Sequence, residues 1–130
     1  MSFISEDCRY EDMIYTKPFV GRQAIRAFFE EQTSFFKDGL DFVIDEISGG
    51  SSDSCGLTWH VEFQGKVFPN SRGCSYYRCA VGADGKQQIV YGRDMVESAL
   101  KPGSASLVLL RFVAALFKRF PKLLDVASSE

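Results

Sequence analysis

Cysteine and histidine are scarce in this chain, and their positions form no metal-ligand pattern. The 130 residues include one histidine and four cysteines, Cys8, Cys55, Cys74 and Cys79. No two cysteines are three positions apart as in a C-x-x-C pair, and four are too few for a disulfide scaffold. We therefore expect no metal site, no cofactor and reduced, partly buried thiols.

The sequence also lacks a basic excess, a secretory signal and a membrane-spanning segment. The net charge of -2 gives no positive field for a phosphate backbone, so we expect no nucleic acid partner. No basic stretch followed by an apolar run begins the chain. The final apolar element, residues 106–120, contains Arg111 and is too short to cross a bilayer. We expect a soluble intracellular protein, cytoplasmic or, if a targeting peptide was removed, in an organelle such as a plastid.

The length and composition are those of one globular domain with an added C-terminal element. The chain is 45% hydrophobic and 25% charged, and 130 residues suffice for a single core. Lys101-Pro102-Gly103 separates the last helix from the rest. We therefore predict a domain over residues 1–100, and a helix and tail over 101–130 that pack on the domain or on a partner.

Hydrophobic spacing predicts a strand, a helix, four antiparallel strands and a last helix. Loose alternation over residues 8–15 predicts a short edge strand, which ends before Pro18 and Gly21. Apolar positions three and four apart predict a helix from Arg22 to the stop at Lys37-Asp38-Gly39. The remaining predicted strands cover residues 41–47, 57–63, 73–81 and 89–96.

Three segments together resemble the SnoaL-like branch of the nuclear transport factor 2-like superfamily, which includes ketosteroid isomerases and polyketide cyclases. They are Tyr10-Glu11-Asp12 leading to PFVGRQAI at 18–25, residues 59–65, and Asp84-Gly85-Lys86 followed by YGRDMVE at 91–97. The resemblance implies an α+β, cystatin-like fold, in which a curved antiparallel sheet forms a cone around helices and encloses an apolar pocket. It also implies a homodimer formed through the outer face of the sheet.

The resemblance implies that Asp12, at the end of the first strand, is a general base. Burial in an apolar cavity would raise its pKa toward values useful for proton transfer. The alternative is that Asp12 only ends the strand by accepting backbone hydrogen bonds. Asp94, on one strand face with Val90 and Gly92, is the second candidate, because two facing carboxylates split into a donor and an acceptor. Arg93 is expected to pair with Glu97 or Asp94 at the rim.

The remaining site residues follow from the same resemblance and from strand alternation. Ser75 stands where the isomerases carry a protonated aspartate, with Tyr77 on the same face, so steroid isomerisation is not expected. The other residues expected to bind substrate are Trp59, Val61, Val90, Tyr15 and Phe28. His60 and Glu62 alternate out of phase with Trp59, and we expect them to form a hydrogen-bonded pair at the outer dimer interface.

Two functions follow from these observations. The first is binding of a small hydrophobic ligand, with isomerase, lyase or cyclase chemistry by the pocket carboxylates. The second is a noncatalytic dimeric scaffold, whose C-terminal helix docks to a protein or, through residues 106–120, to a membrane surface. Arg111 and Lys118 are seven apart and share one face of that helix. The family's domains begin with helices that cover the cone, whereas here little precedes Cys8, so we expect either a truncated sequence or covering by the C-terminal helix.

Overall fold

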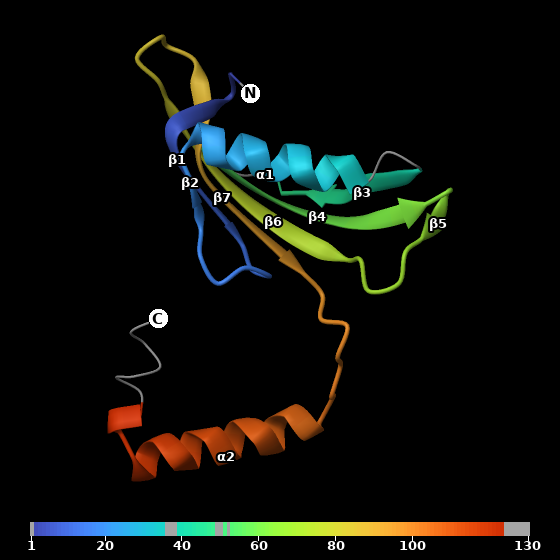
Figure 1. Cartoon of the computed structure of the whole chain (residues 1–130), viewed down its shortest axis with the longest axis vertical. Helices are drawn as coiled ribbons and strands as arrows, with labels where there is room; N and C mark the ends of the chain where they lie inside the picture. The colour runs from blue at the N-terminus through green and yellow to red at the C-terminus, as the bar shows by residue number, and fades with distance from the viewer. Residues whose placement is uncertain (1, 36–38, 49–50, 52, 124–130) are drawn as a thin grey trace. The chain divides into compact units, whose positions relative to one another are not determined.

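Most of the chain folds into a curved sheet and one helix that lies on the concave side of the sheet (Figure 1). The computed structural model describes residues 2–35, 39–48, 51 and 53–123. Its elements are β1 (Ile4–Asp12), β2 (Phe19–Val20), α1 (Arg22–Phe35), β3 (Leu40–Ile47), β4 (Ser54–Phe63), β5 (Lys66–Val67), β6 (Gly73–Val81), β7 (Gln87–Val96) and α2 (Ala105–Arg119). The strand order is β2-β1-β7-β6-β4-β3, and β5 pairs with β4. The predicted α+β fold, with its curved sheet and C-terminal helix, is confirmed.

The chain divides into two units, Met1–Glu97 and Ser98–Glu130. The first contains the whole sheet and α1, and the second contains α2. Among the described residues, no helix is both long and apolar enough to cross a membrane. The four cysteines are not disulfide-bonded.

The first strand differs from the prediction in extent and in position. It covers Ile4–Asp12 and lies inside the sheet, parallel to β7 and antiparallel to the two-residue β2. It ends early because the Asp12 carboxylate accepts the Ile14 N–H at 3.0 Å and the Asp12 carbonyl accepts the Tyr15 N–H at 2.9 Å. These bonds turn the chain, so the apolar residues at 13–15 do not extend the strand.

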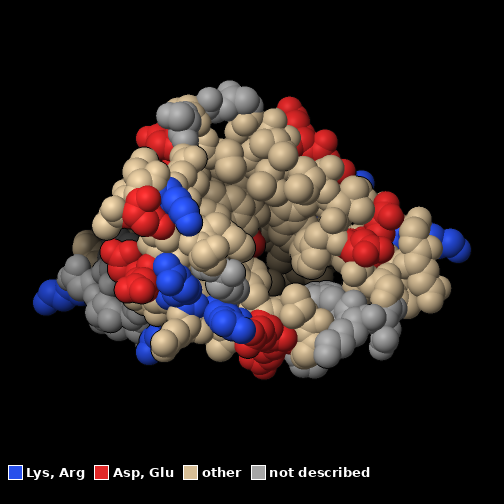
Figure 2. Space-filling model, turned by 90° about the horizontal axis from the view of Figure 1, so that it is seen from above, with Lys and Arg blue, Asp and Glu red and all other residues tan. Residues whose placement is uncertain are grey.

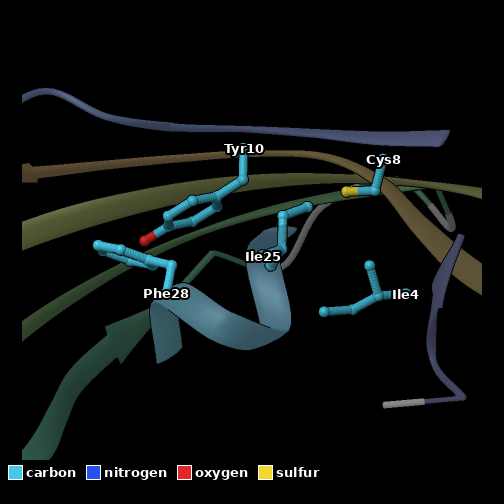
Figure 3. Packing of buried hydrophobic residues seen from close by; sticks show 5 residues of the cluster. All are labelled: Ile4, Cys8, Tyr10, Ile25 and Phe28. Atoms are coloured by element: carbon cyan, nitrogen blue, oxygen red, sulfur yellow. The ribbon is translucent and has the colours of Figure 1, made fainter. Parts of the chain in front are cut away.

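The core lies between α1 and the first strands, as Figure 3 shows. The buried cluster comprises Ile4, Cys8, Tyr10, Ile25 and Phe28. Gly21 permits the chain to enter α1 with a φ of +89°, and its N–H donates to the Cys8 carbonyl at 2.8 Å. The apolar stripe of the helix then packs on β1 and β2.

The far half of the concave face, formed by β3 and β4, is less well covered. Phe42, Ile44 and Ile47 are each more than half exposed, and in register they lie opposite Val61, Trp59 and Leu57. A contiguous exposed apolar surface of this kind usually marks a binding site. The concave face therefore combines a packed half near α1 with an open apolar half.

The outer face of β1 and β7 carries a charged network centred on Glu11. Its carboxylate accepts hydrogen bonds from Tyr91 at 2.7 Å and from Arg93 at 2.6 Å, and it pairs with Arg9 at 3.0 Å. Arg93 thus pairs with Glu11, a partner that the sequence did not indicate. The reason is the parallel register, which places Glu11 directly beside Arg93.

Gly73 provides the space for the Trp59 indole. A Cβ added at position 73 would lie 2.2 Å from the indole, well inside van der Waals contact. We predict that Gly73→Ala displaces Trp59 and lowers the free energy of unfolding by about 1–3 kcal/mol. Urea unfolding followed by the fluorescence of Trp59, the single tryptophan, measures this. Gly56→Ala is the control, since its nearest neighbour would be 3.6 Å away, and equal stability of both variants would contradict the prediction.

Glu11 predicts a specific acid dependence of stability. Hydrogen bonds from Tyr91 and then from Arg93 lower the pKa of Glu11 from 4.5 to about 2. A carboxyl whose pKa is lower in the folded state stabilises the fold above its unfolded pKa, and this contribution disappears as the pH falls toward the folded value. Glu11→Gln should therefore differ from the unsubstituted protein above pH 4.5 and converge with it toward pH 2. Denaturant unfolding across this range measures the difference, and Tyr91→Phe should shift the loss to higher pH, whereas Tyr76→Phe should not.

Candidate functional site

Asp94 lies at the centre of a hydrogen-bonded cluster on the concave face. Its Oδ2 accepts the Tyr10 hydroxyl at 2.5 Å, and its Oδ1 accepts the Tyr77 hydroxyl at 3.1 Å. The two phenols come from the strands on either side of β7, namely β1 and β6. Both oxygens of Asp94 thus act as acceptors, which is the role of an ionised carboxylate.

Gly92 makes this convergence possible. In register it lies between Tyr10 and Tyr77, two residues before Asp94 on β7. A Cβ at this position would be 3.0 Å from both tyrosine rings, so a larger residue would push the rings apart. The bare backbone lets the two rings lie over β7 and reach the carboxylate with their hydroxyl groups.

The environment keeps both phenols protonated. Burial raises the pKa of Tyr10 above its ordinary value, and the hydrogen bond to Asp94 adds to this effect. Burial likewise raises the pKa of Tyr77, followed by the negative charge of Asp94. Both groups therefore remain hydrogen-bond donors far into the alkaline range.

Asp12 is the neighbour of Asp94 on the adjacent parallel strand. The two are Cα partners in the register and their carboxylates interact electrostatically. Burial raises the pKa of Asp12, and the charge of Asp94 raises it further, while the hydrogen bond from the Ile14 N–H opposes the shift. Asp12 therefore ends β1, as the alternative expected, and it lies beside the second carboxylate, while its role as a general base remains a prediction.

The cluster continues across the sheet through hydroxyl groups. The Trp59 indole N–H donates to Ser75 Oγ at 2.9 Å, and Ser75, which is 6% exposed, is the β6 partner of Asp94. The Ser75 hydroxyl also interacts with the Tyr77 phenol, and this interaction lowers the pKa of Tyr77 in opposition to the larger effect of burial. Trp59, Ser75, Tyr77 and Asp94 thus form one continuous polar cluster across three strands.

The polar cluster borders the open apolar half of the concave face. Trp59 packs edge-on against Phe42, with ring centroids 5.3 Å apart. In the view of Figure 2, mostly uncharged residues surround a hollow, and most of the charged residues lie farther out. The row Asp12, Asp94, Ser75 and Leu57 crosses four neighbouring strands and changes from polar to apolar along its length.

The other residues expected to bind substrate occupy different settings. Val61 is buried in β4, and Phe28 is buried in the core against Tyr10, with ring centroids 5.7 Å apart. Tyr15 is partly exposed and packs edge-on against Phe28. Val90 lies at an irregularity in the β6–β7 register, so the alternation through Gly92 and Asp94 does not extend to it.

Two surface pockets lie away from the Asp94 cluster. One, of about 460 Å³, is lined by Ser5, Glu6, Asp7, Arg22, residues 80–84, Gln88 and Val90. The other, of about 340 Å³, is lined by Phe63, Gln64, Lys66, Val67, Phe68 and Pro69. Of the residues expected to bind substrate, Val90 lines the first of these pockets. A pocket at Asp12 and Asp94 therefore remains a prediction.

His60 and Glu62 lie on the opposite face, as strand alternation predicted. The two His60 ring nitrogens are 2.8 Å from Asp45 Oδ1 and 3.2 Å from Glu62 Oε1. The hydrogen bond to Glu62, followed by the contact with Asp45, raises the pKa of His60. The predicted pair thus forms within one chain, and its role in a homodimer interface remains a prediction. Among the described residues, no cluster of three His, Cys, Asp or Glu side chains could hold a metal ion.

Tyr10 is the site residue that the sequence reasoning missed. It stands two positions before Asp12, on the same strand face, and Gly92 stands two positions before Asp94. This matching spacing of an aromatic residue and a glycine was the available signal. It could be interpreted only with the knowledge that β1 and β7 are parallel neighbours.

Comparisons with solved structures find the same fold at low sequence identity. A candidate isomerase of the SnoaL-like family from Agrobacterium tumefaciens matches with 19% identity and a TM-score of 0.58, over 75% of this chain and 76% of that one. A nuclear transport factor 2-like protein of unknown function from Pseudomonas putida matches with 13% identity and a TM-score of 0.61, over 78% and 79%. A cystatin-like domain of unknown function from Nostoc punctiforme matches with 17% identity and a TM-score of 0.56, over 98% and 80%.

A search of the curated proteins finds no match. The family model of the SnoaL-like domain matches residues 1–90, which is more than half of the sequence. This confirms the resemblance that the three sequence segments carried. The chain therefore belongs to the SnoaL-like family.

Proposed function

We propose that the concave face of the first unit binds a small apolar carbonyl compound and that Asp12 moves a proton at the carbon next to the carbonyl. The fold is consistent with small-molecule binding or an isomerase-type function. The observation that supports this proposal is the Asp94 cluster, which places Asp12 beside a second carboxylate at the border of an open apolar surface.

The apolar half of the face supplies the binding energy in this proposal. Burying a side chain of the size of Phe or Ile contributes about 1.5–3 kcal/mol, and Phe42, Ile44 and Ile47 are all available for burial. Neighbouring strands are about 5 Å apart, so Asp94 and Leu57, which are two strands apart, are separated by roughly 10 Å. A ligand with one ring or two fused rings would contact both the polar part of the concave face at Asp94 and its apolar part at Leu57.

Asp12 is better suited than Asp94 to exchange a proton with a ligand. Both oxygens of Asp94 already accept a phenol, whereas Asp12 accepts the Ile14 N–H at Oδ1, which leaves Oδ2 for a ligand. The pKa of Asp12 is raised by burial and by Asp94, and a ligand that displaces water would raise it further. Asp94 thus acts through Asp12 and through the phenols as a positioning residue.

The proton transfer needs no cofactor. The C–H bond next to the carbonyl breaks, Asp12 takes the proton, and the electron pair moves to the carbonyl oxygen to form an enolate. The Ser75 hydroxyl, which accepts the Trp59 N–H and keeps its own hydrogen, is the nearby donor for the developing negative charge, whereas the Tyr77 hydroxyl donates to Asp94. Return of the proton to a different carbon completes an isomerisation, and the net composition of the substrate is unchanged.

The noncatalytic alternative uses the same face for binding alone. It differs in one respect, because it predicts that the bound ligand exchanges no proton with Asp12. Ligand binding without proton exchange in the unsubstituted protein would support this alternative and would contradict the proposed chemistry.

The first test uses 2-tetralone, a fused-ring ketone with exchangeable protons next to its carbonyl. We expect the protein to accelerate exchange of these protons for deuterium in D₂O, measured by proton NMR. Asp12→Asn should slow the protein-dependent exchange by about 10²- to 10⁴-fold, the usual contribution of a general base. Binding of 2-tetralone, followed by Trp59 fluorescence, should be retained.

Two variants serve as controls for this experiment. Asp94→Asn should reduce exchange less than Asp12→Asn, because it removes a charge that raises the pKa of Asp12 rather than the base itself. Asp41→Asn changes an exposed carboxylate on β3, paired in register with Glu62, and should leave exchange unchanged. Exchange that survives Asp12→Asn undiminished would refute the role of Asp12.

The second test concerns the phenols that surround Asp94. Because the charge and hydrogen bonds of Asp94 contribute to the raised pKa values of Tyr10 and Tyr77, Asp94→Asn should lower both. An absorbance titration near 295 nm should then show more ionised tyrosine at about pH 11 in the variant, since free tyrosine ionises near pH 10. Asp41→Asn is again the control, and identical titration curves for the Asp94→Asn and unsubstituted proteins would contradict the described cluster.

A further inference from the structure

The helix α2 combines an apolar surface with an unusual excess of positive charge. None of its residues is buried, and Leu109, Leu110 and Phe112 are each more than 60% exposed. Its last turn carries Lys118 and Arg119, and its first turn carries no acidic residue. An apolar helix surface of this kind requires an environment that covers it.

Charge is sharply divided between the two units. Residues 98–130 contain five basic and two acidic residues, Asp125 and Glu130, whereas residues 1–97 contain ten basic and fifteen acidic residues. The first unit is therefore net negative and the segment that contains α2 is net positive. Any electrostatic attraction to an anionic surface would therefore come from the segment that contains α2, because the same surface would repel the negatively charged sheet unit.

The apolar sector of α2 is wide. At 100° per residue, a sector of roughly 200° contains Val108, Leu109, Leu110, Phe112, Val113, Leu116 and Phe117. Ser106 and Arg119 lie within this sector in the first and last turns. Arg111 and Lys118 lie near the middle of the opposite side, together with Leu107 in the first turn. A helix that packs on one face of a globular partner needs an apolar stripe of only about 100° or somewhat more.

We propose that α2 binds parallel to the surface of an anionic membrane and tethers the sheet unit to it. A bilayer interface surrounds more than half of an embedded helix, which suits a 200° sector better than a single protein groove does. The basic side chains extend from the helix toward the lipid headgroups. The helix lies at the surface and does not cross, in agreement with its length and hydropathy. This proposal does not depend on the ligand or chemistry of the concave face.

The test measures binding of the full chain to vesicles by cosedimentation. We expect binding to vesicles of phosphatidylcholine with about 30% phosphatidylserine, weaker binding to phosphatidylcholine alone, and a decrease with added salt. Each basic residue near the surface contributes about a fivefold increase in partitioning, so Arg111→Gln with Lys118→Gln should reduce partitioning about thirtyfold. Leu109→Ala with Leu116→Ala should reduce it more than tenfold while preserving helix propensity.

A matched variant and a lipid-free measurement separate this proposal from its alternatives. Arg26→Gln with Lys86→Gln removes the same charge from exposed positions of the sheet unit and should change partitioning by less than about twofold. Equal partitioning of all variants, or equal binding to neutral and anionic vesicles, would overturn the proposal. Sedimentation equilibrium without lipid should show no association that depends on Leu109 and Leu116. If it does, the apolar sector of α2 covers a second copy of the chain, and the membrane proposal is wrong.

Discussion

The parallel pairing of β1 with β7 determines where the polar groups of the concave face meet. Its register places Tyr10 beside Gly92 and Asp12 beside Asp94. One pairing therefore delivers a phenol to the Asp94 carboxylate and a second carboxylate next to it, while the same register brings Glu11 to Arg93 on the outer face. A slip of one residue would exchange the two faces of β1, and would place Glu11 against the core and Tyr10 in solvent.

The sequence predicted the elements well where periodicity is strong and where strands follow one another. The helix α1, the strands β3, β4, β6 and β7 and the helix α2 all lie close to their expected positions, since each carries a clear period of two or 3.6. The first strand was less predictable. Its alternation continues through Met13 and Tyr15, and only the local hydrogen bonds of Asp12 show that the chain turns there.

Prediction of the site was limited by contacts between residues distant in sequence. Asp12 and Asp94 were identified from a family resemblance and from strand alternation, and the structure brings them to neighbouring strands. Tyr10 was missed because its contact with Asp94 spans 84 positions and requires a parallel pair that periodicity cannot reveal. Val90 was misplaced relative to Asp94, because an irregularity in the register interrupts the alternation at that point.

The energetics of the concave face favour a functional explanation for its carboxylates. Like charges placed opposite each other on neighbouring strands destabilise a sheet, and Asp12 and Asp94 are such a pair. The buried phenol of Tyr10 and the partly buried phenol of Tyr77 donate hydrogen bonds to Asp94, which offsets part of this cost. Apolar residues at both positions would avoid the cost entirely. Local arrangements that are unfavourable for stability are concentrated at functional sites, and this one lies at the border of the exposed apolar surface that a ligand would cover.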